Sequence, residues 1–282
     1  MYLKLLSIAT FVLSVPVSPK TGVEMTVGNI CIPEGVFKYN LLIGLAGLFW
    51  AISYALIIYR GVKDKTYGMP MLVLCTNIVW EFMLGIMGAP IVSVGSALEM
   101  SRQPLVMRIV DVVWFLFDYG ILFLLFKYGR EEFEKFHPSA PKWVFVPVIL
   151  AFLVLSAIVY AVCVYEWGDY NGIYGAYVGN VLISVFFIRM LWQRGNADGQ
   201  SMWIGFAKFM GTFCTFLFGG MVLRGEWGVT KSILFELEFW PLVKLCVILI
   251  VLFDIVYLAF LYHTMRYKLH LNPWTRKPLT SE

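Results

Sequence analysis

The stretch "WVFVPVILAFLVLSAIVYAVCVY" (Trp143 to Tyr165) is apolar throughout and contains no charged residue. Its length is close to the roughly 20 residues that a helix needs to cross the hydrocarbon core of a bilayer. The whole chain of 282 residues has the same character, because 60% of it is hydrophobic, 17% is aromatic and only 14% is charged. A soluble domain of this size would be far more polar. The sequence therefore predicts an all-α fold, a polytopic transmembrane helical bundle.

Similar apolar segments recur along the chain, separated by short connections. They cover residues 40–59, 69–89, 105–127, 143–165, 172–193, 203–223 and 240–263. We therefore predict one seven-helix membrane domain over residues 40–265 and a cytosolic tail over 266–282. Residues 1–39 are predicted to be a signal-like or interfacial segment and a loop, because their apolar stretch is short and is broken by Pro16 and Pro19. An eighth helix is the alternative for this segment.

Basic residues set the predicted orientation, because cytoplasmic loops carry an excess of Lys and Arg. They follow the segments 40–59, 105–127 and 172–193 and end the chain, whereas the connection "EWGDYNG" (Glu166 to Gly172) has none. This pattern predicts a cytosolic C-terminus in a multi-pass integral membrane protein. The expected compartment is the endoplasmic reticulum if the source is fungal and the inner membrane if it is bacterial. Because the positive charges lie in short loops, the net charge of +4 does not indicate nucleic-acid binding.

Four acidic residues lie inside the apolar segments: Glu81, Asp111, Asp118 and Asp254. Ionisable residues at membrane depth are costly, and they mark functional sites by default. At about 1.5 Å per residue, Glu81 and Asp254 both come near the bilayer midplane. Asp111 and Asp118 are two helical turns apart, so they share one face of the predicted helix 105–127. These residues are therefore expected to line one cavity from three helices.

The sequence places no Lys, Arg or His at the expected depth of Glu81 and Asp254. A carboxyl group buried without a cation partner favours its protonated form. It is then a proton donor in an apolar pocket, as general-acid chemistry on a hydrophobic substrate requires. Alternatively, these carboxyl groups only hold neighbouring helices together through hydrogen bonds.

Aromatic residues at similar depths, Trp80 and Trp114 among them, are expected to line the cavity. Such rings attract cations without offering a nucleophile, although aromatic packing is also ordinary in membrane proteins. After the turn formers Gly195 to Gly199, Gln200 and Ser201 are predicted to cap the next helix. Lys208 lies about two turns into that helix. We expect it to extend toward lipid phosphate or to contact a polar group of a substrate.

Four stretches resemble one family, the integral-membrane terpene cyclases of fungal meroterpenoid and indole-diterpene pathways. These are the pyripyropene- and paxilline-type cyclases, which have relatives in bacteria. The similar stretches are "DKTYGMPMLVLCTNIVWEF" (Asp64 to Phe82), "VVWFLFDYGILFLLFKYG" (Val112 to Gly129), "YGAYVGNVLISVFFIRMLWQR…GQSMWIGFAKFMGT" (Tyr174 to Thr212) and "VLFDIVYLAFLYH" (Val251 to His263). The resemblance covers roughly residues 40–265, and its most specific feature is Trp-Glu at 80–81 together with Asp254.

The resemblance implies cyclisation of a prenyl chain attached to an aromatic or polyketide head group. A terminal epoxide or olefin is protonated, and rings close through carbocations. Glu81 and Asp254 would be the catalytic acid pair, with Asp254 as the proton donor or its partner. The expected substrate-binding residues are Asn77, Trp80, Asp111, Trp114, Asp118, Tyr177, Asn180, Lys208 and Tyr257. The partners expected are a hydrophobic prenylated small molecule and the lipid bilayer, with the protein as a monomer or a loose oligomer.

The chain has no DxDD, DDxxD or NDxxD motif. We therefore expect neither a metal site nor any cofactor, because a reaction started by a proton needs none. A proton-coupled small-molecule transporter using the same midplane carboxyl groups remains an alternative, although no internal repeat is apparent. A retinal protein would need a lysine in the middle of the last helix, where Asp254 stands instead. A non-catalytic scaffold is the third alternative.

Overall fold

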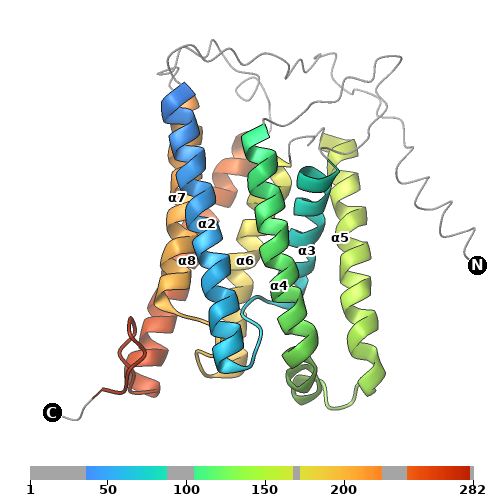
Figure 1. Cartoon of the computed structure of the whole chain (residues 1–282), viewed down its shortest axis with the longest axis vertical. Helices are drawn as coiled ribbons and strands as arrows, with labels where there is room; N and C mark the ends of the chain where they lie inside the picture. Colours follow the sequence, from blue (N-terminus) through green and yellow to red (C-terminus); the bar gives the residue numbers. More distant parts are fainter. Residues whose placement is uncertain (1–35, 88–104, 168–171, 224–239, 280–282) are drawn as a thin grey trace, which may run out of the picture.

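A computed structural model of the chain describes residues 36–87, 105–167, 172–223 and 240–279. The predicted N-terminal segment 1–39 falls almost entirely outside these residues. The described part is helical apart from its turns and one isolated β-bridge near the C-terminus. The helices are α2 (Val36–Asp64), α3 (Met71–Glu81), α4 (Leu105–Phe136), α5 (Phe145–Trp167), α6 (Ile173–Arg194), α7 (Met202–Leu223) and α8 (Trp240–His263), with shorter helical segments η1 (Phe82–Ile86), η2 (Lys142–Val144) and η3 (Thr264–Lys268). Seven helices were predicted, and the described residues form seven α-helices, of which α3 is short with 11 residues; Figure 1 shows their arrangement.

Length and apolar composition make five helical segments of the described residues long enough to cross a membrane: Gly44–Asp64, Arg108–Phe136, Lys142–Val164, Ile173–Arg194 and Leu245–Lys268. The apolar segment Met71–Ile86 is shorter. Helices suit such segments because each backbone N–H and C=O group finds its partner within the helix and none is left unsatisfied in lipid. The fold is therefore an all-α transmembrane bundle, as the sequence predicts.

Six helices form a closed ring in which α3 packs on α4, α4 on α2, α2 on α7, α7 on α8, α8 on α6, and α6 on α3. Helix α5 packs on the outside of α3 and lies at the edge of the bundle in Figure 1. Its peripheral position agrees with its exposure, because only 22% of its most apolar stretch is buried inside the protein. The ring thus encloses an interior that side chains from six helices can reach.

Helix α3 is short because the chain changes its helical geometry directly after Glu81. It starts after Pro70 and continues as the π-helical segment η1, where the N–H of Met87 donates to Phe82 O at 3.0 Å. Such π-bulges are rare and occur frequently at functional sites. Gly85 lies in this segment, and a Cβ there would come within 2.9 Å of Val112 N on α4. Gly85 therefore allows η1 to approach the part of α4 that carries Asp111.

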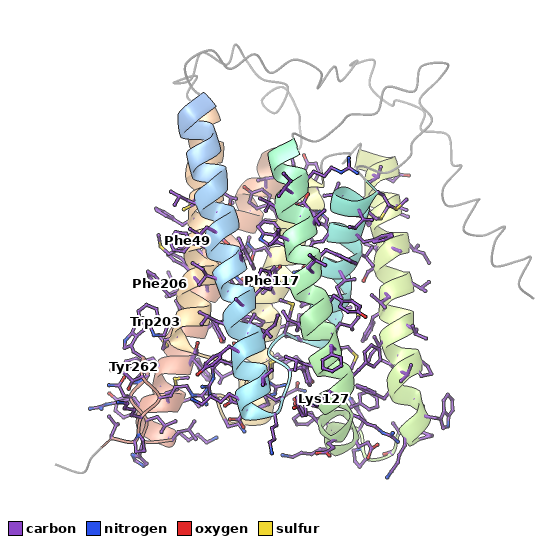
Figure 2. All side chains as sticks on the ribbon, in the orientation of Figure 1. Phe49, Phe117, Lys127, Trp203, Phe206 and Tyr262 are labelled. Atoms are coloured by element: carbon purple, nitrogen blue, oxygen red, sulfur yellow. The ribbon has the colours of Figure 1, made fainter. Side chains whose placement is uncertain are left out.

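The connections α2–α3, α4–α5 and α6–α7 lie at the end of the bundle to which the C-terminal segment returns (Figure 1). Figure 2 shows Lys127 toward this end of α4. Turn formers end α6 as predicted, since Gly195 is left-handed (φ 63°) and its N–H donates to Leu191 O. Ser201 caps α7 by accepting the Ile204 N–H at 3.2 Å. Gln200 does not cap this helix through its side chain, which instead reaches toward α8.

The C-terminal segment folds back onto this end of the bundle. Arg276 donates to the Asp64 carboxylate at 3.2 Å and to the carbonyl oxygens of Ala197 and Gln200. Burial lowers the pKa of the Arg276 guanidinium, and the Asp64 carboxylate opposes this change. Residues 271 and 278 form the β-bridge that closes the turn. The predicted tail is therefore attached to two interhelical connections through one arginine.

Candidate functional site

The interior of the ring contains buried polar side chains from all six helices. They include Ser53 and Tyr54 of α2, Glu81 of α3, Asp111 and Asp118 of α4, Asn180 and Ser184 of α6, Lys208 and Thr212 of α7, and Asp254 of α8. Six of them form two groups. The acidic cluster consists of Glu81, Asp111 and Asp118, and the ion-pair cluster consists of Lys208, Asp254 and Ser184. Because burial of unpaired polar groups is costly, their partners indicate what each cluster can do.

Glu81 is held by a chain of hydrogen bonds from its own helix and from α2. The Asn77 amide donates to the Tyr54 hydroxyl at 2.9 Å, and that hydroxyl donates to Glu81 Oε1 at 3.3 Å. Glu81 is only 1% exposed, and its second oxygen, Oε2, has no hydrogen-bond partner among the described residues. The two oxygens therefore differ, because Oε1 is fixed by Tyr54, whereas Oε2 has no hydrogen bond of ordinary length and the carboxyl group has Asp118 as its other polar neighbour.

Asp111 and Asp118 surround Glu81 with further carboxyl groups. Both are fully buried, and none of their four carboxyl oxygens has a hydrogen bond of ordinary length to the described residues, although the carboxyl groups of Asp118 and Glu81 are close enough to share a proton. Both interact electrostatically with Glu81. Like charges at close range in a medium of low dielectric constant cannot all ionise. In this part of the structure no Lys, Arg or His forms a salt bridge with the acidic cluster. Protons must therefore balance much of its charge.

This arrangement places the acidic proton of Glu81 on a particular atom. Oε1 accepts the Tyr54 hydroxyl proton, so the proton of a neutral Glu81 is carried by Oε2. The Asp118 carboxyl group is the protein neighbour that can share this proton, and a substrate bound in the cluster could accept it instead. The acidic cluster thus has the form of a general acid in apolar surroundings.

The ion-pair cluster corrects the expectation that Asp254 lacks a cation. Lys208 Nζ lies 2.6 Å from Asp254 Oδ1 and 2.9 Å from Oδ2, and it also donates to Ser184 Oγ at 2.7 Å. Lys208 is only 1% exposed, so the expectation that it extends to lipid phosphate is wrong. Its three N–H donors are directed at protein acceptors rather than at a polar head group.

Trp50 and Tyr54 of α2 lie between the two clusters. They are one helical turn apart, and their ring centroids are 5.7 Å from each other. Tyr54 contacts Glu81, whereas Trp50 lies under Lys208, whose Nζ is 5.7 Å from the centroid of the indole ring. Gly211 of α7 allows this approach, because a Cβ there would lie 2.5 Å from Trp50. One aromatic pair therefore contacts both clusters.

Two rings of α4 lie next to this aromatic pair. Trp114 lies 6.4 Å from both Trp50 and Tyr54, and Phe117 lies 6.5 Å from Tyr54, measured between ring centroids. Figure 2 shows Phe117 between α2 and α4. The predicted contribution of Trp114 to an aromatic surface near Glu81 thus agrees with its position. The aromatic wall is defined here as Trp50, Tyr54, Trp114 and Phe117.

Trp80 and Tyr177 are not among the polar contacts of the two clusters. Trp80 packs against the start of α6, where its indole N–H donates to Gly172 O at 2.9 Å and a Cβ on Gly175 would lie 2.8 Å from its ring. Tyr177 is half-buried on α6 and lies near Cys246 of α8. Trp80 thus joins α3 to α6 rather than facing the same side as Glu81.

Asn180 and Tyr257 lie near the ion-pair cluster and have protein partners. Asn180 donates to Thr212 at 2.8 Å, and its backbone oxygen accepts the Ser184 hydroxyl. The Tyr257 hydroxyl donates to Gln200, and its ring lies 5.4 Å from that of Phe187. Asn180 thus supports the side of the ion pair formed by α6, whereas Tyr257 links α8 to the α6–α7 connection.

The sequence analysis missed Trp50, Tyr54 and Ser184. A signal existed for the first two, because Trp50 and Tyr54 are four residues apart and so share one face of their helix. Nothing in the sequence distinguished that face from a lipid-facing one. Ser184 carried no signal, because an isolated serine is ordinary in a membrane helix.

Comparisons with known proteins identify the family of the chain. A family model described as Pyr4-like transmembrane terpene cyclases matches residues 33–267. The Pyr4-family terpene cyclase mfmH of Annulohypoxylon moriforme is 30% identical over 61% of this chain and 65% of its own length. Terpene cyclase andB of Emericella variicolor is 26% identical over 81% of this chain and 89% of its own. Terpene cyclase pyr4 of Aspergillus fumigatus is 28% identical over 67% of this chain and 71% of its own. No solved structure matches significantly.

The family match spans all seven helices of the structure and both polar clusters. These three relatives are all called terpene cyclases. With a bundle long and apolar enough to cross a membrane, the chain belongs to the family of Pyr4-like transmembrane terpene cyclases.

Proposed function

We propose that this protein cyclises a prenylated aromatic or polyketide precursor inside the membrane. In this proposal a terminal epoxide or olefin is protonated, and rings close through carbocations. The observation that supports it most is the environment of Glu81, a buried carboxyl group beside an aromatic wall, with one oxygen fixed by Tyr54 and the other without a hydrogen bond of ordinary length. The family resemblance supports the same reaction class.

Glu81 supplies the initiating proton in this proposal. The proton leaves Oε2 for the epoxide oxygen, the carbon–oxygen bond breaks, and the carbon becomes cationic. An alkene of the prenyl chain then adds to this carbon, and each addition moves the positive charge to a new carbon. The last cation loses a proton, so that the product is an isomer of the substrate. With an olefin substrate, the same proton adds to carbon instead.

The aromatic wall suits the cationic intermediates of such a reaction. The faces of Trp and Tyr rings attract a cation by about 0.5 to 2 kcal/mol each, depending on desolvation. Trp50, Trp114 and Phe117 carry no hydroxyl, thiol or amine group that would add to a carbocation. Tyr54 has its hydroxyl hydrogen-bonded to Glu81 and Asn77, which reduces its availability as a nucleophile.

Asp254 is the second essential carboxyl group of the proposal. The acid pair that the sequence predicts is here divided between two clusters, with Glu81 in one and Asp254 in the other. The proposed partners are a hydrophobic prenylated small molecule and the lipid bilayer, and the protein is proposed to be a monomer or a loose oligomer. The endoplasmic reticulum is the proposed compartment for a fungal source.

The test is co-expression with candidate prenylated epoxides and olefins, followed by mass and NMR analysis of the products. The proposal expects a cyclised product with the same mass as its precursor. A matched control is membranes that carry Glu81→Gln at the same expression level. Radiolabelled substrate that crosses the membrane without forming any product would favour a proton-coupled transporter and overturn the proposal.

A further inference from the structure

Resting on the proposed function, we propose that Lys208 is a positioning residue that holds Asp254 as a carboxylate. Asp254 is then the base that removes the final proton, and Glu81 alone starts the reaction. The two carboxyl groups that the sequence groups as an acid pair thereby have opposite tasks. The assignment follows from the different partners of the two groups.

The hydrogen bonds of Lys208 account for every donor of a charged ammonium group. An ammonium nitrogen has three N–H donors, and a neutral amine has two. Lys208 Nζ has three acceptors, the two oxygens of Asp254 and Ser184 Oγ, at 2.6, 2.9 and 2.7 Å. Ser184 accepts this bond because its own hydroxyl proton goes to Asn180 O at 3.0 Å. The arrangement therefore fits a lysine cation opposite a carboxylate anion.

The surroundings of Lys208 favour the same charge state. The indole face of Trp50 lies 5.7 Å from Nζ, and such a face attracts a cation. Among the described residues, Asp254 is the acidic partner of Lys208, and Lys208 is the basic partner of Asp254. The pair is neutral as a whole, so both charges persist in a buried place where either alone would be unfavourable.

The acidic cluster shows the opposite arrangement. Glu81 has Asp111 and Asp118 as neighbours, whereas Asp254 has a cation. Glu81 therefore holds a proton that it can give, and Asp254 holds a lone pair that can accept one. Trp50 and Tyr54 lie between the two, so a cation that moves along this wall starts near the donor and ends near the acceptor.

The final step balances with these groups. A C–H bond beside the last cation breaks, its electron pair forms the alkene, and the proton binds an oxygen of Asp254. Asp254 then releases this proton to water, and Glu81 regains one from water. Lys208 keeps its three protons throughout and does not contact the substrate, which is why it is a positioning residue.

The test compares product formation by Lys208→Met, Asp254→Asn and the double variant. Without Lys208, Asp254 is expected to take up a proton and to lose its function as a base. Loss of a general acid or base lowers rates by on the order of 10²–10⁴-fold. We expect that loss of the normal product in each single variant, with substrate diverted to hydrated or otherwise terminated products. The double variant should form as little of the normal product as Asp254→Asn, because Lys208 acts only through Asp254.

Separate controls distinguish failure of this inference from failure of the proposed function. Glu81→Gln should consume no substrate at all, and Lys142→Met, an exposed lysine, should behave like wild type. Lys208→Arg keeps the charge and should retain the normal product at a lower rate. If the Lys208→Met protein does not accumulate in the membrane, product formation by Asp254→Asn and by the double variant is compared instead. The double variant removes both charges of the ion pair, so it leaves no buried charge without a partner.

Several results would overturn the inference. One is a Lys208→Met protein that forms the normal product at the wild-type rate. Another is a double variant that regains activity, since the pair would then be only structural. A third is complete loss of substrate consumption in Asp254→Asn, as in Glu81→Gln, because Asp254 would then be needed to start the reaction. If wild-type protein forms no cyclised product, the proposed function fails instead.

Discussion

Replacement of Tyr54 by Phe tests whether the hydrogen-bond chain orients Glu81. The change removes one oxygen atom and leaves the ring in its packing against Trp50, Trp114 and Phe117. Two bonds are lost, the 3.3 Å bond to Glu81 Oε1 and the 2.9 Å bond from Asn77. A donor left unsatisfied in a buried place costs about 1–3 kcal/mol, and we expect about 1–2 kcal/mol because Asn77 is only half-buried.

The effect on catalysis is expected to be separable from the effect on stability. A positioning hydrogen bond of about 1 kcal/mol corresponds to a five- to tenfold fall in kcat. In the double variant Tyr54→Phe with Asn77→Leu, the amide donor that Tyr54→Phe leaves without an acceptor is also removed. This double variant should therefore regain stability but not kcat. Unfolding of detergent-solubilised protein can be followed with a thiol-reactive fluorophore, since Cys75, Cys214 and Cys246 are buried, after the half-buried Cys163 is replaced by Ser. A Tyr54→Phe protein with unchanged kcat would refute the claim that Tyr54 orients Glu81.

Three further predictions concern the scaffold and its orientation. Gly172→Ala should lower the free energy of unfolding by about 1–2 kcal/mol or more, because Gly172 is left-handed (φ 65°) and its Cβ would lie 2.5 Å from Trp80. Gly44→Ala is the control, since nothing lies within 4 Å of its Cβ, and equal melting of both variants would contradict the reasoning. Arg276→Ala should speed proteolysis of the C-terminal segment, whereas the control Lys277→Ala should not. Equal cleavage rates of the two variants would show that Arg276 does not hold this segment on the bundle. Lys277→Cys should react with an impermeant maleimide from the cytosolic side only, and labelling from the other side would reverse the orientation.

The helices were predictable because the apolar segments are long enough to cross a membrane and basic residues separate several of them. The run Trp143–Tyr165 became most of α5, and the segment 69–89 became α3 and η1. Which helices are neighbours was not predictable, because that depends on local fits between distant residues. Two examples of such fits are the close contact of Gly85 with α4 and the close contact of Gly211 with Trp50.

The acidic residues were placed correctly in the interior, but the partner of Asp254 was missed. Counted from the start of its helix, Asp254 comes near the bilayer midplane, where the sequence places no cation. From the other end, His263, it lies nine residues or about 14 Å away, and Lys208 lies six residues or about 9 Å from the start of α7. The long lysine side chain spans the remaining difference. Distance along one helix therefore could not predict the pair.

The most direct test of the central claim is the activity of Glu81→Gln on a prenylated substrate that wild-type protein cyclises. Glutamine keeps the size of the side chain and an oxygen that can accept the Tyr54 hydroxyl proton, but it has no acidic proton to donate. The claim predicts that the variant inserts into the membrane at wild-type levels, melts at a similar temperature and leaves the substrate unchanged. Formation of the cyclised product at the wild-type rate would contradict it.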